Sequence, residues 1–353
     1  RPDEQDRPRE RFNGLADRLA SFGPFEEKNY QVELISGVYI PENPCGMDID
    51  EMLNRANMAR KSIVSPRGSR ILFFTEELRK KALAGIEMEA EMRSALDKEE
   101  FVLYLQPQIK LTDVSGQKAH RAEALVRWMR NGRIYAMPDD FIGLFEKNGM
   151  IAELDLYIYE RICILINRFK ACGLTSVCIA VNVSRHTMMQ PDFVETYLEI
   201  KKRYRIEDDE LELEFTESIA VEELELMQKV LKQLKKAGFI CAMDDFGTGY
   251  SSLNVLQILP LDILKLDKGF LACEGEDRRR QIVVKSVLQM AKQLDMLTIV
   301  EGVENEEQLH LLQKVGCDYL QGFLVSPPLS EDEYRSFVKE EEFHGGESEI
   351  RQI

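Results

Sequence analysis

From Phe101 to about Leu324, the sequence alternates between short apolar runs and longer amphipathic segments. The short runs have the length and the β-branched or aromatic content of strands, and most of the gaps between them carry a helical pattern. Strand–helix alternation repeated this often predicts a largely parallel sheet. The expected strands are 101–106, 122–128, 177–184, 211–216, 239–244, 263–267, 297–301 and 319–324.

The repeating segment spans about 240 residues, close to the ~250 typical of a (β/α)8 barrel. Its first two runs are joined by a turn-rich segment at 110–117, which favours a hairpin and therefore an antiparallel first strand. An open doubly wound sheet is the alternative, but no GxGxxG motif opens the unit. We therefore expect an α/β fold: a TIM-type (β/α)8 barrel with an antiparallel first strand over residues 98–342.

Polar side chains recur inside or at the carboxyl ends of these expected strands. Each one alone has an ordinary explanation; Glu123, for example, suits an exposed edge strand. Together they would require strand after strand to bury an unpaired polar group, which is costly. In a barrel they can instead converge on the face where active sites lie. The residues are Glu123, Asn182, Glu214, Asp244, Asp245, Lys265, Glu301 and Gln321.

The segment Ile240–Leu253 shows this pattern most clearly, because its apolar run ends in Asp244 and Asp245 and two glycines follow. Neighbouring strand residues project to opposite faces unless the strand end twists, so both acids reach one site only at a distorted strand end. Carboxylates gathered at one barrel mouth repel one another unless cations lie between them. Oxygen ligands select hard divalent ions, so we expect Mg²⁺ or Mn²⁺.

The chain carries 62 acidic and 46 basic residues, a net charge of −16. This excess argues against nucleic-acid binding over a broad surface. Seven cysteines without CxxC spacing and four scattered histidines argue against a disulfide framework or a zinc site, and indicate a reducing cytoplasm. No apolar run approaches the roughly 18 residues of a membrane span. Because the chain begins at Arg1, we expect a fragment, with an upstream sensor or membrane anchor left open.

Upstream of the expected barrel, we interpret residues 1–74 as a small α/β segment and 75–97 as a linker helix; at the other end, 343–353 is a flexible tail. In the first segment, Ile35-Ser-Gly-Val-Tyr-Ile40 and the run from Asp50 to Lys61 resemble the closing strand and helix of a GGDEF domain. The GGDEF signature itself is absent. The resemblance therefore implies a partial, degenerate remnant without cyclase activity.

Residues 95–340 resemble the EAL-domain cyclic-di-GMP phosphodiesterases, because eight motifs recur in one order with sensible gaps. They are Gln106-Pro107, Glu123-Ala-Leu-Val-Arg-Trp128, Asn182-Val-Ser184, Glu214-Phe-Thr-Glu-Ser218, Asp244-Asp-Phe-Gly-Thr-Gly249, Lys265-Leu-Asp267, Glu301-Gly-Val-Glu304 and Gln321-Gly-Phe323. This resemblance implies hydrolysis of cyclic di-GMP to linear pGpG with two divalent ions, Mg²⁺ or Mn²⁺.

The resemblance also implies a role for each matching position. Ligands of a first ion would be Glu123, Asn182, Glu214 and Asp244, and of a second Asp244, Asp245 and Glu301. Lys265 would hold the attacking water or the charge developing on phosphate, and Glu301 would act as general base or orient that water. Substrate contacts would be Gln106, Leu125, Arg127, Glu304 and Gln321, with the Arg127 fork on a phosphate. Glu217 would anchor the 246–252 loop.

Two alternatives to this function stay open. One is a catalytically silent cyclic-di-GMP receptor, although no expected ligand is missing from the sequence. The other is a metal-dependent hydrolase of a different phosphoester, since fold does not fix function. The resemblance further implies a homodimer formed through the 246–252 loop and the helix after it.

Overall fold

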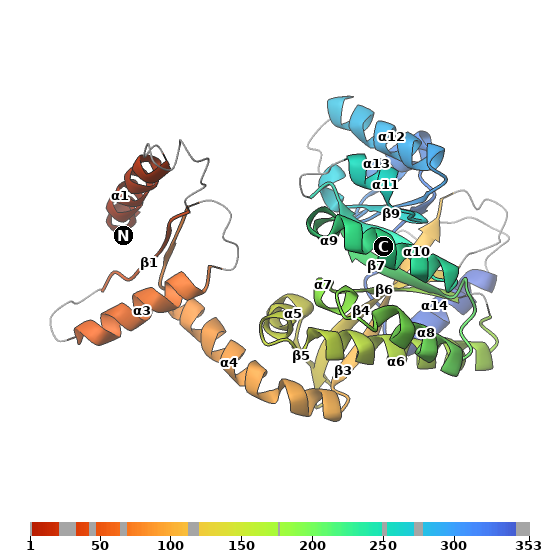
Figure 1. Ribbon diagram of the computed structural model, residues 1–353, viewed down its shortest axis with the longest axis horizontal. Helices are drawn as coiled ribbons and strands as arrows, with labels where there is room; N and C mark the ends of the chain where they lie inside the picture. The colour runs from red at the N-terminus through yellow and green to blue at the C-terminus, as the bar shows by residue number, and fades with distance from the viewer. Residues whose placement is uncertain are drawn as a thin grey trace. The chain divides into compact units, whose positions relative to one another are not determined.

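The computed structural model describes residues 2–20, 33–41, 47–63, 69–111, 120–175, 177–248, 253–271 and 278–343. Residues 112–117 of the expected turn, residues 249–252 of the expected dimer loop, and the tail from 344 onward lie outside the described residues. The chain divides into two compact units, Arg1–Met92 and Arg93–Ile353 (Figure 1).

The first unit is built around a small βαβ arrangement. Strands β1 (Ile35–Val38) and β2 (Arg70–Phe73) are parallel, and helix α3 (Ile49–Lys61) connects them. A Cβ added to Gly37 would lie 2.0 Å from the carbonyl oxygen of Ala56 on α3, so glycine permits the close approach of helix and strand. The unit also contains α1 (Pro2–Ala20) and the start of α4 (Glu76–Asp97).

The second unit is the expected barrel. Its strands follow the order β3-β11-β10-β9-β8-β7-β6-β4, and pairing of β3 with β4 closes the sheet. Strand β3 is antiparallel to both of its neighbours, and the other pairs around the barrel are parallel. The TIM-type fold with an antiparallel first strand is thus confirmed. The strands are β3 (Phe101–Lys110), β4 (His120–Arg130), β6 (Val177–Asn182), β7 (Leu211–Thr216), β8 (Ile240–Phe246), β9 (Ile263–Leu266), β10 (Leu297–Val300) and β11 (Tyr319–Leu320).

Helices cover the outside of this barrel (Figure 1). Helix α10 illustrates why they form: Met227, Val230, Leu231 and Leu234 repeat at helical spacing, are buried, and face β8. The helices are α5 (Pro138–Lys147), α6 (Ile151–Ala171), α7 (Arg185–Met188), α8 (Phe193–Arg203), α9 (Glu217–Glu222), α10 (Leu224–Lys236), α11 (Leu253–Ile258), α12 (Arg278–Gln293), α13 (Glu306–Val315) and α14 (Glu331–Phe343), with a short 3-10 turn at Lys268–Phe270.

One strand, β5 (Arg133–Ala136), was not expected from the sequence. It pairs with β4 as a hairpin, and its turn residues Asn131 and Gly132 have φ of 51° and 71°. Asn-Gly is the sequence signal for such a two-residue turn, so this hairpin was readable in advance. Among the described helices, none combines the length and apolar character needed to cross a membrane.

Candidate active site

A buried lysine lies at the centre of the polar cluster. The Lys265 Nζ atom on β9 lies 2.6–3.2 Å from carboxylate oxygens of Glu123, Glu214, Asp244 and Glu301. These acids come from β4, β7, β8 and the end of β10, so the parallel strands bring them together as expected. Burial alone would lower the pKa of Lys265, but the surrounding carboxylates outweigh it and raise that pKa well above its usual range. The lysine is therefore a permanent cation.

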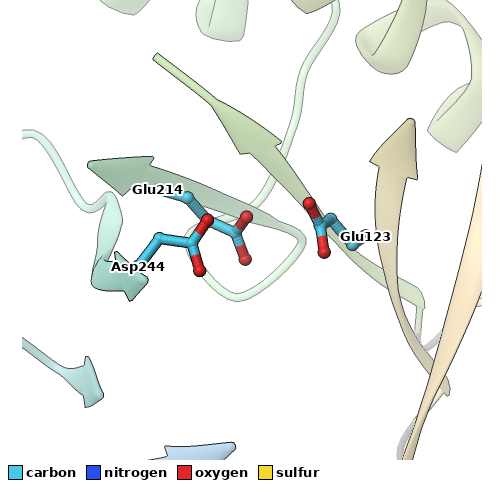
Figure 2. Close-up of side chains that lie close together, drawn as sticks. All are labelled: Glu123, Glu214 and Asp244. Atoms are coloured by element: carbon cyan, nitrogen blue, oxygen red, sulfur yellow. The ribbon is translucent and has the colours of Figure 1, made fainter. Parts of the chain in front are cut away.

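The acids form two overlapping groups that share Asp244. One oxygen from each of Glu123, Glu214 and Asp244 lies within 4.8 Å of the others (Figure 2), and the same holds for Asp244, Asp245 and Glu301. Within the described residues, Glu214 Oε1, Asp244 Oδ1 and Glu301 Oε1 share one cationic partner, the Lys265 ammonium, and Glu214 Oε2 has no hydrogen-bond donor. Several buried carboxylate oxygens that share a single ammonium are ligands of the kind that a hard divalent cation prefers, so the donor set fits Mg²⁺ or Mn²⁺.

Burial and crowding raise the pKa values of three acids in this cluster. Burial raises the pKa of Glu214 well above its usual range, with Lys265 opposing the shift. Burial likewise raises the pKa of Glu301 to about 8 despite the opposing charge of Lys265. For Asp245, burial and then the neighbouring charge of Asp244 raise the pKa. One lysine does not compensate the whole acid cluster, and further positive charge would be favourable there.

A distortion at the end of β8 lets both neighbouring aspartates reach the site. The β8–β9 register shifts between Met243 and Phe246, and Asp245 adopts a left-handed φ of 56°. A bulge of this kind reorients a side chain that regular alternation would send to the other face. The sequence left open whether the strand end twists, and the structure shows that it does.

Amide side chains hold Glu123 from both sides. The Asn182 Nδ2 atom donates to Glu123 Oε1 at 2.9 Å, and Gln321 Nε2 donates to Glu123 Oε2 at 2.7 Å. Gln321 also donates to Gln106 Oε1, and Gln108 Nε2 donates to Gln321 Oε1 at 2.9 Å. Gln108 was missed from the sequence. The available signal was its position two residues from Gln106 on the same strand face.

The other expected residues lie at varying distances from this cluster. Leu125 is half-buried and lines a cavity of about 710 Å³ together with Asn182 and Asp245. The buried Arg127 donates to the carbonyl oxygen of Val126, with its guanidinium 5.9 Å from the centre of the Tyr104 ring. Glu304 is exposed, and its backbone N–H donates to Gln308. The structure brings neither Arg127 nor Glu304 into contact with the acids through a described interaction.

Glu217 links the site to the loop after β8. Its side chain is buried, and Oε2 accepts a hydrogen bond from the Gly247 N–H at 2.8 Å. Gly247 has a φ of 99°, and a Cβ there would lie 2.0 Å from the Phe270 ring. The described start of the loop is therefore held by a carboxylate and covered by an aromatic ring.

Comparison with known proteins finds similarity over most of the chain. The EAL domain family model matches residues 89–328. The chain is 33% identical over 284 residues to the cyclic di-GMP phosphodiesterase NbdA of Pseudomonas aeruginosa, which covers 80% of this chain and 36% of that protein. It is 30% identical over 319 residues to the signaling protein YkoW of Bacillus subtilis, covering 90% and 39%. The chain thus spans about two fifths of the length of these curated relatives.

A solved structure is also similar to this chain. The PaMucR phosphodiesterase in its c-di-GMP complex superposes with a TM-score of 0.64 and 31% sequence identity, and the match covers 70% of this chain and 98% of that one.

Proposed function

The chain belongs to the EAL domain family, and from this premise we propose that its second unit hydrolyses cyclic di-GMP to linear pGpG with two divalent metal ions, Mg²⁺ or Mn²⁺. The observation that carries the proposal is the pair of carboxylate groups sharing Asp244 around the buried Lys265. Two ion sites side by side are the arrangement used for in-line displacement at phosphorus. The names of NbdA and PaMucR support the substrate.

The residues that would hold the ions follow from these groups. Glu123, Asn182, Glu214 and Asp244 would hold one ion, and Asp244, Asp245 and Glu301 the other. When bound, such ions make water acidic enough to attack phosphorus at neutral pH and stabilise the charge on the attacking and leaving oxygens. The hydrogen bond from Gln321 to Glu123 supports the proposal, because an outer partner of this kind orients a metal-binding carboxylate.

In the proposed reaction, water adds across one phosphodiester. A new phosphorus–oxygen bond forms, the bond from phosphorus to a ribose 3′ oxygen breaks, and that oxygen gains a proton. Glu301 would act as general base or orient the attacking water, a role supported by its place among the acids at the end of β10. Lys265 remains charged and lies 2.6 Å from Glu301, where an ammonium stabilises negative charge developing on the phosphate.

Substrate binding would use the surface beside the acids. The cavity lined by Leu125 borders two of the proposed metal ligands, Asn182 and Asp245. The Arg127 guanidinium would exchange its bond to the Val126 carbonyl for a phosphate, which its planar fork accepts in bidentate fashion. Gln106 would contact the substrate from the amide network around Gln321, and Glu304 from the exposed segment after Glu301.

The decisive experiment is turnover with a defined product. Purified protein is incubated with cyclic di-GMP and Mg²⁺ or Mn²⁺, and the products are separated by chromatography beside a Glu123→Ala variant. We expect linear pGpG from the unaltered protein and loss of at least 100-fold in rate for the variant. Unchanged dinucleotide that stays bound would indicate the silent receptor. Faster hydrolysis of a generic phosphoester would overturn the substrate.

We also propose that the protein forms a homodimer through the 246–252 loop and the helix after it. Sedimentation velocity at high protein concentration tests this proposal. A cytoplasmic location is supported by four buried free thiols, Cys163, Cys178, Cys241 and Cys317. From the sequence resemblance, we also propose that residues 1–74 are a degenerate GGDEF segment.

A further inference from the structure

A second buried ion pair lies beside the acid cluster in the barrel interior. Arg121 and Glu212 each precede a proposed metal ligand by two residues, Glu123 on β4 and Glu214 on β7. Residues two apart on a strand share a face, so this pair points into the same interior one step closer to the amino ends of the strands. Arg121 is 9% exposed and Glu212 is 0% exposed, and Arg121 Nη2 donates to Glu212 Oε2.

The ion pair spans the width of an intervening strand. Strand β6 lies between β4 and β7, with Cys178 opposite Arg121 and Ala180 opposite Glu212. Both of these side chains are small and buried, which leaves room for the long arginine to reach β7. The ring of Tyr319 on β11 lies 5.3 Å from the guanidinium carbon and contributes a cation–π contact.

The pair is electrostatically coupled to the acids above it. Within the described residues, Arg121 Nε and Glu212 Oε1 have no hydrogen-bond partner, so the ion pair leaves part of both groups unsatisfied. The charge of Arg121 also interacts favourably with Glu214. The charge of Glu212 interacts with Lys265, Glu123 and Asp244. In an interior of low dielectric such interactions are weakly screened.

We propose that Glu212 is a positioning residue for the metal site: it retains and neutralises the Arg121 guanidinium, so that Glu123 and Glu214 remain available to divalent ions. This role rests on the proposed metal-dependent function. Without Glu212, the buried arginine would carry an uncompensated charge, and the other carboxylate with which that charge interacts is Glu214 of the site itself. The guanidinium would then compete with the metal for the same oxygens.

The test is Mn²⁺ binding to the full chain, measured by the electron paramagnetic resonance of free Mn²⁺ without substrate. Residues behind a metal site typically change affinity by 10–100-fold, so Glu212→Gln is expected to raise the Mn²⁺ Kd at least about tenfold. Adding Arg121→Met to the same variant removes the competing cation and should return the Kd to within about threefold of the unaltered protein. Glu225→Gln, which removes an exposed acid from α10, controls for net charge.

The outcomes separate this role from a purely structural one. An unchanged Kd for E212Q, or a double variant as weak as E212Q, would overturn the proposal, because a packing role predicts no rescue. If E212Q is recovered only unfolded, the double variant decides: a Kd within about threefold of the unaltered protein supports the role, and a tenfold loss overturns it. Failure of the unaltered protein to bind Mn²⁺ would refute the metal site itself, and shows before any variant is compared.

Discussion

The Nζ atom of Lys265 lies 2.8 Å from Oε1 of Glu214, and neither side chain has any exposed surface. An ion pair so buried is sustained by its neighbours, because desolvation of each charge costs several kcal/mol. Here the same ammonium also lies within 3.2 Å of carboxylate oxygens of Glu123, Asp244 and Glu301. Lys265 therefore has two roles: it stabilises the metal-free barrel and supplies a positive charge at the proposed reaction centre.

Replacing this lysine should affect stability and turnover together. We expect Lys265→Met to lower the free energy of unfolding of the metal-free protein by about 3–5 kcal/mol, as for other buried ion pairs that lose one partner. Urea titration in the presence of a chelator measures this change, with exposed Lys202→Met as the matched control. Turnover of cyclic di-GMP should fall by at least 100-fold even when Mn²⁺ restores stability. A stable variant with full activity would contradict both roles.

The stability of the metal-free protein should fall as pH rises from 4.5 to about 8. Burial raises the pKa of Glu301 from 4.5 to about 8, so in this window the folded protein keeps a proton that the unfolded chain releases. The stabilising contribution is complete below pH 4.5 and is lost as pH passes 8. The raised pKa values of Glu214 and Asp245 act in the same direction.

Thermal unfolding with a chelator, followed between pH 5.5 and 8.5, checks this prediction. Glu301→Gln should flatten the dependence, whereas exposed Glu225→Gln should leave it intact. Added Mg²⁺ or Mn²⁺ should stabilise the protein more at pH 8 than at pH 6, because protons compete with the metal for the carboxylates. A Tm of the metal-free protein that rises across this range would contradict the assignment.

Glu217 should act through the hydrogen bond that its oxygen accepts from Gly247. Glu217→Ala removes the acceptor for a backbone N–H, so the loop after Asp245 loses its anchor and turnover should fall about tenfold or more. Glu217→Gln keeps an acceptor oxygen and should retain most of the activity. Steady-state kinetics on both variants gives the comparison, and equal losses would argue that charge rather than the hydrogen bond is required.

Gln108 should matter because it orients Gln321, whose amide donates to Glu123. Gln108→Leu fills a similar volume but removes the donor to Gln321 Oε1, so the Gln321 amide loses one of its three hydrogen bonds and Glu123 is held less firmly. We expect kcat/KM to fall about tenfold, in line with other residues behind a metal site, with the fold retained by circular dichroism. Exposed Gln293→Leu is the control. Unaltered kinetics for Gln108→Leu would show that the amide network is dispensable.

Much of this arrangement could be predicted from local pattern. Strand and helix periodicities are properties of short windows, so the order of the barrel elements followed from them. Polar residues ending consecutive strands then had to meet, because a closed parallel sheet gathers its carboxyl ends at one rim. The convergence of Glu123, Glu214, Asp244 and Glu301 was therefore predictable without coordinates. The β5 hairpin was equally local in origin, and its Asn131-Gly132 signal was overlooked.

The sequence by itself determined which side chains meet at the barrel mouth. Only the tertiary structure decided how they are arranged: Lys265 at the centre of the acids, Asp245 turned inward by a bulge, Gln108 behind Gln321, and Arg121 paired with Glu212. Each of these depends on the register between strands far apart in the chain and on the space left by the residues between them. No short stretch of sequence contains that information, because a change of one residue in register would send each side chain to the opposite face of the sheet.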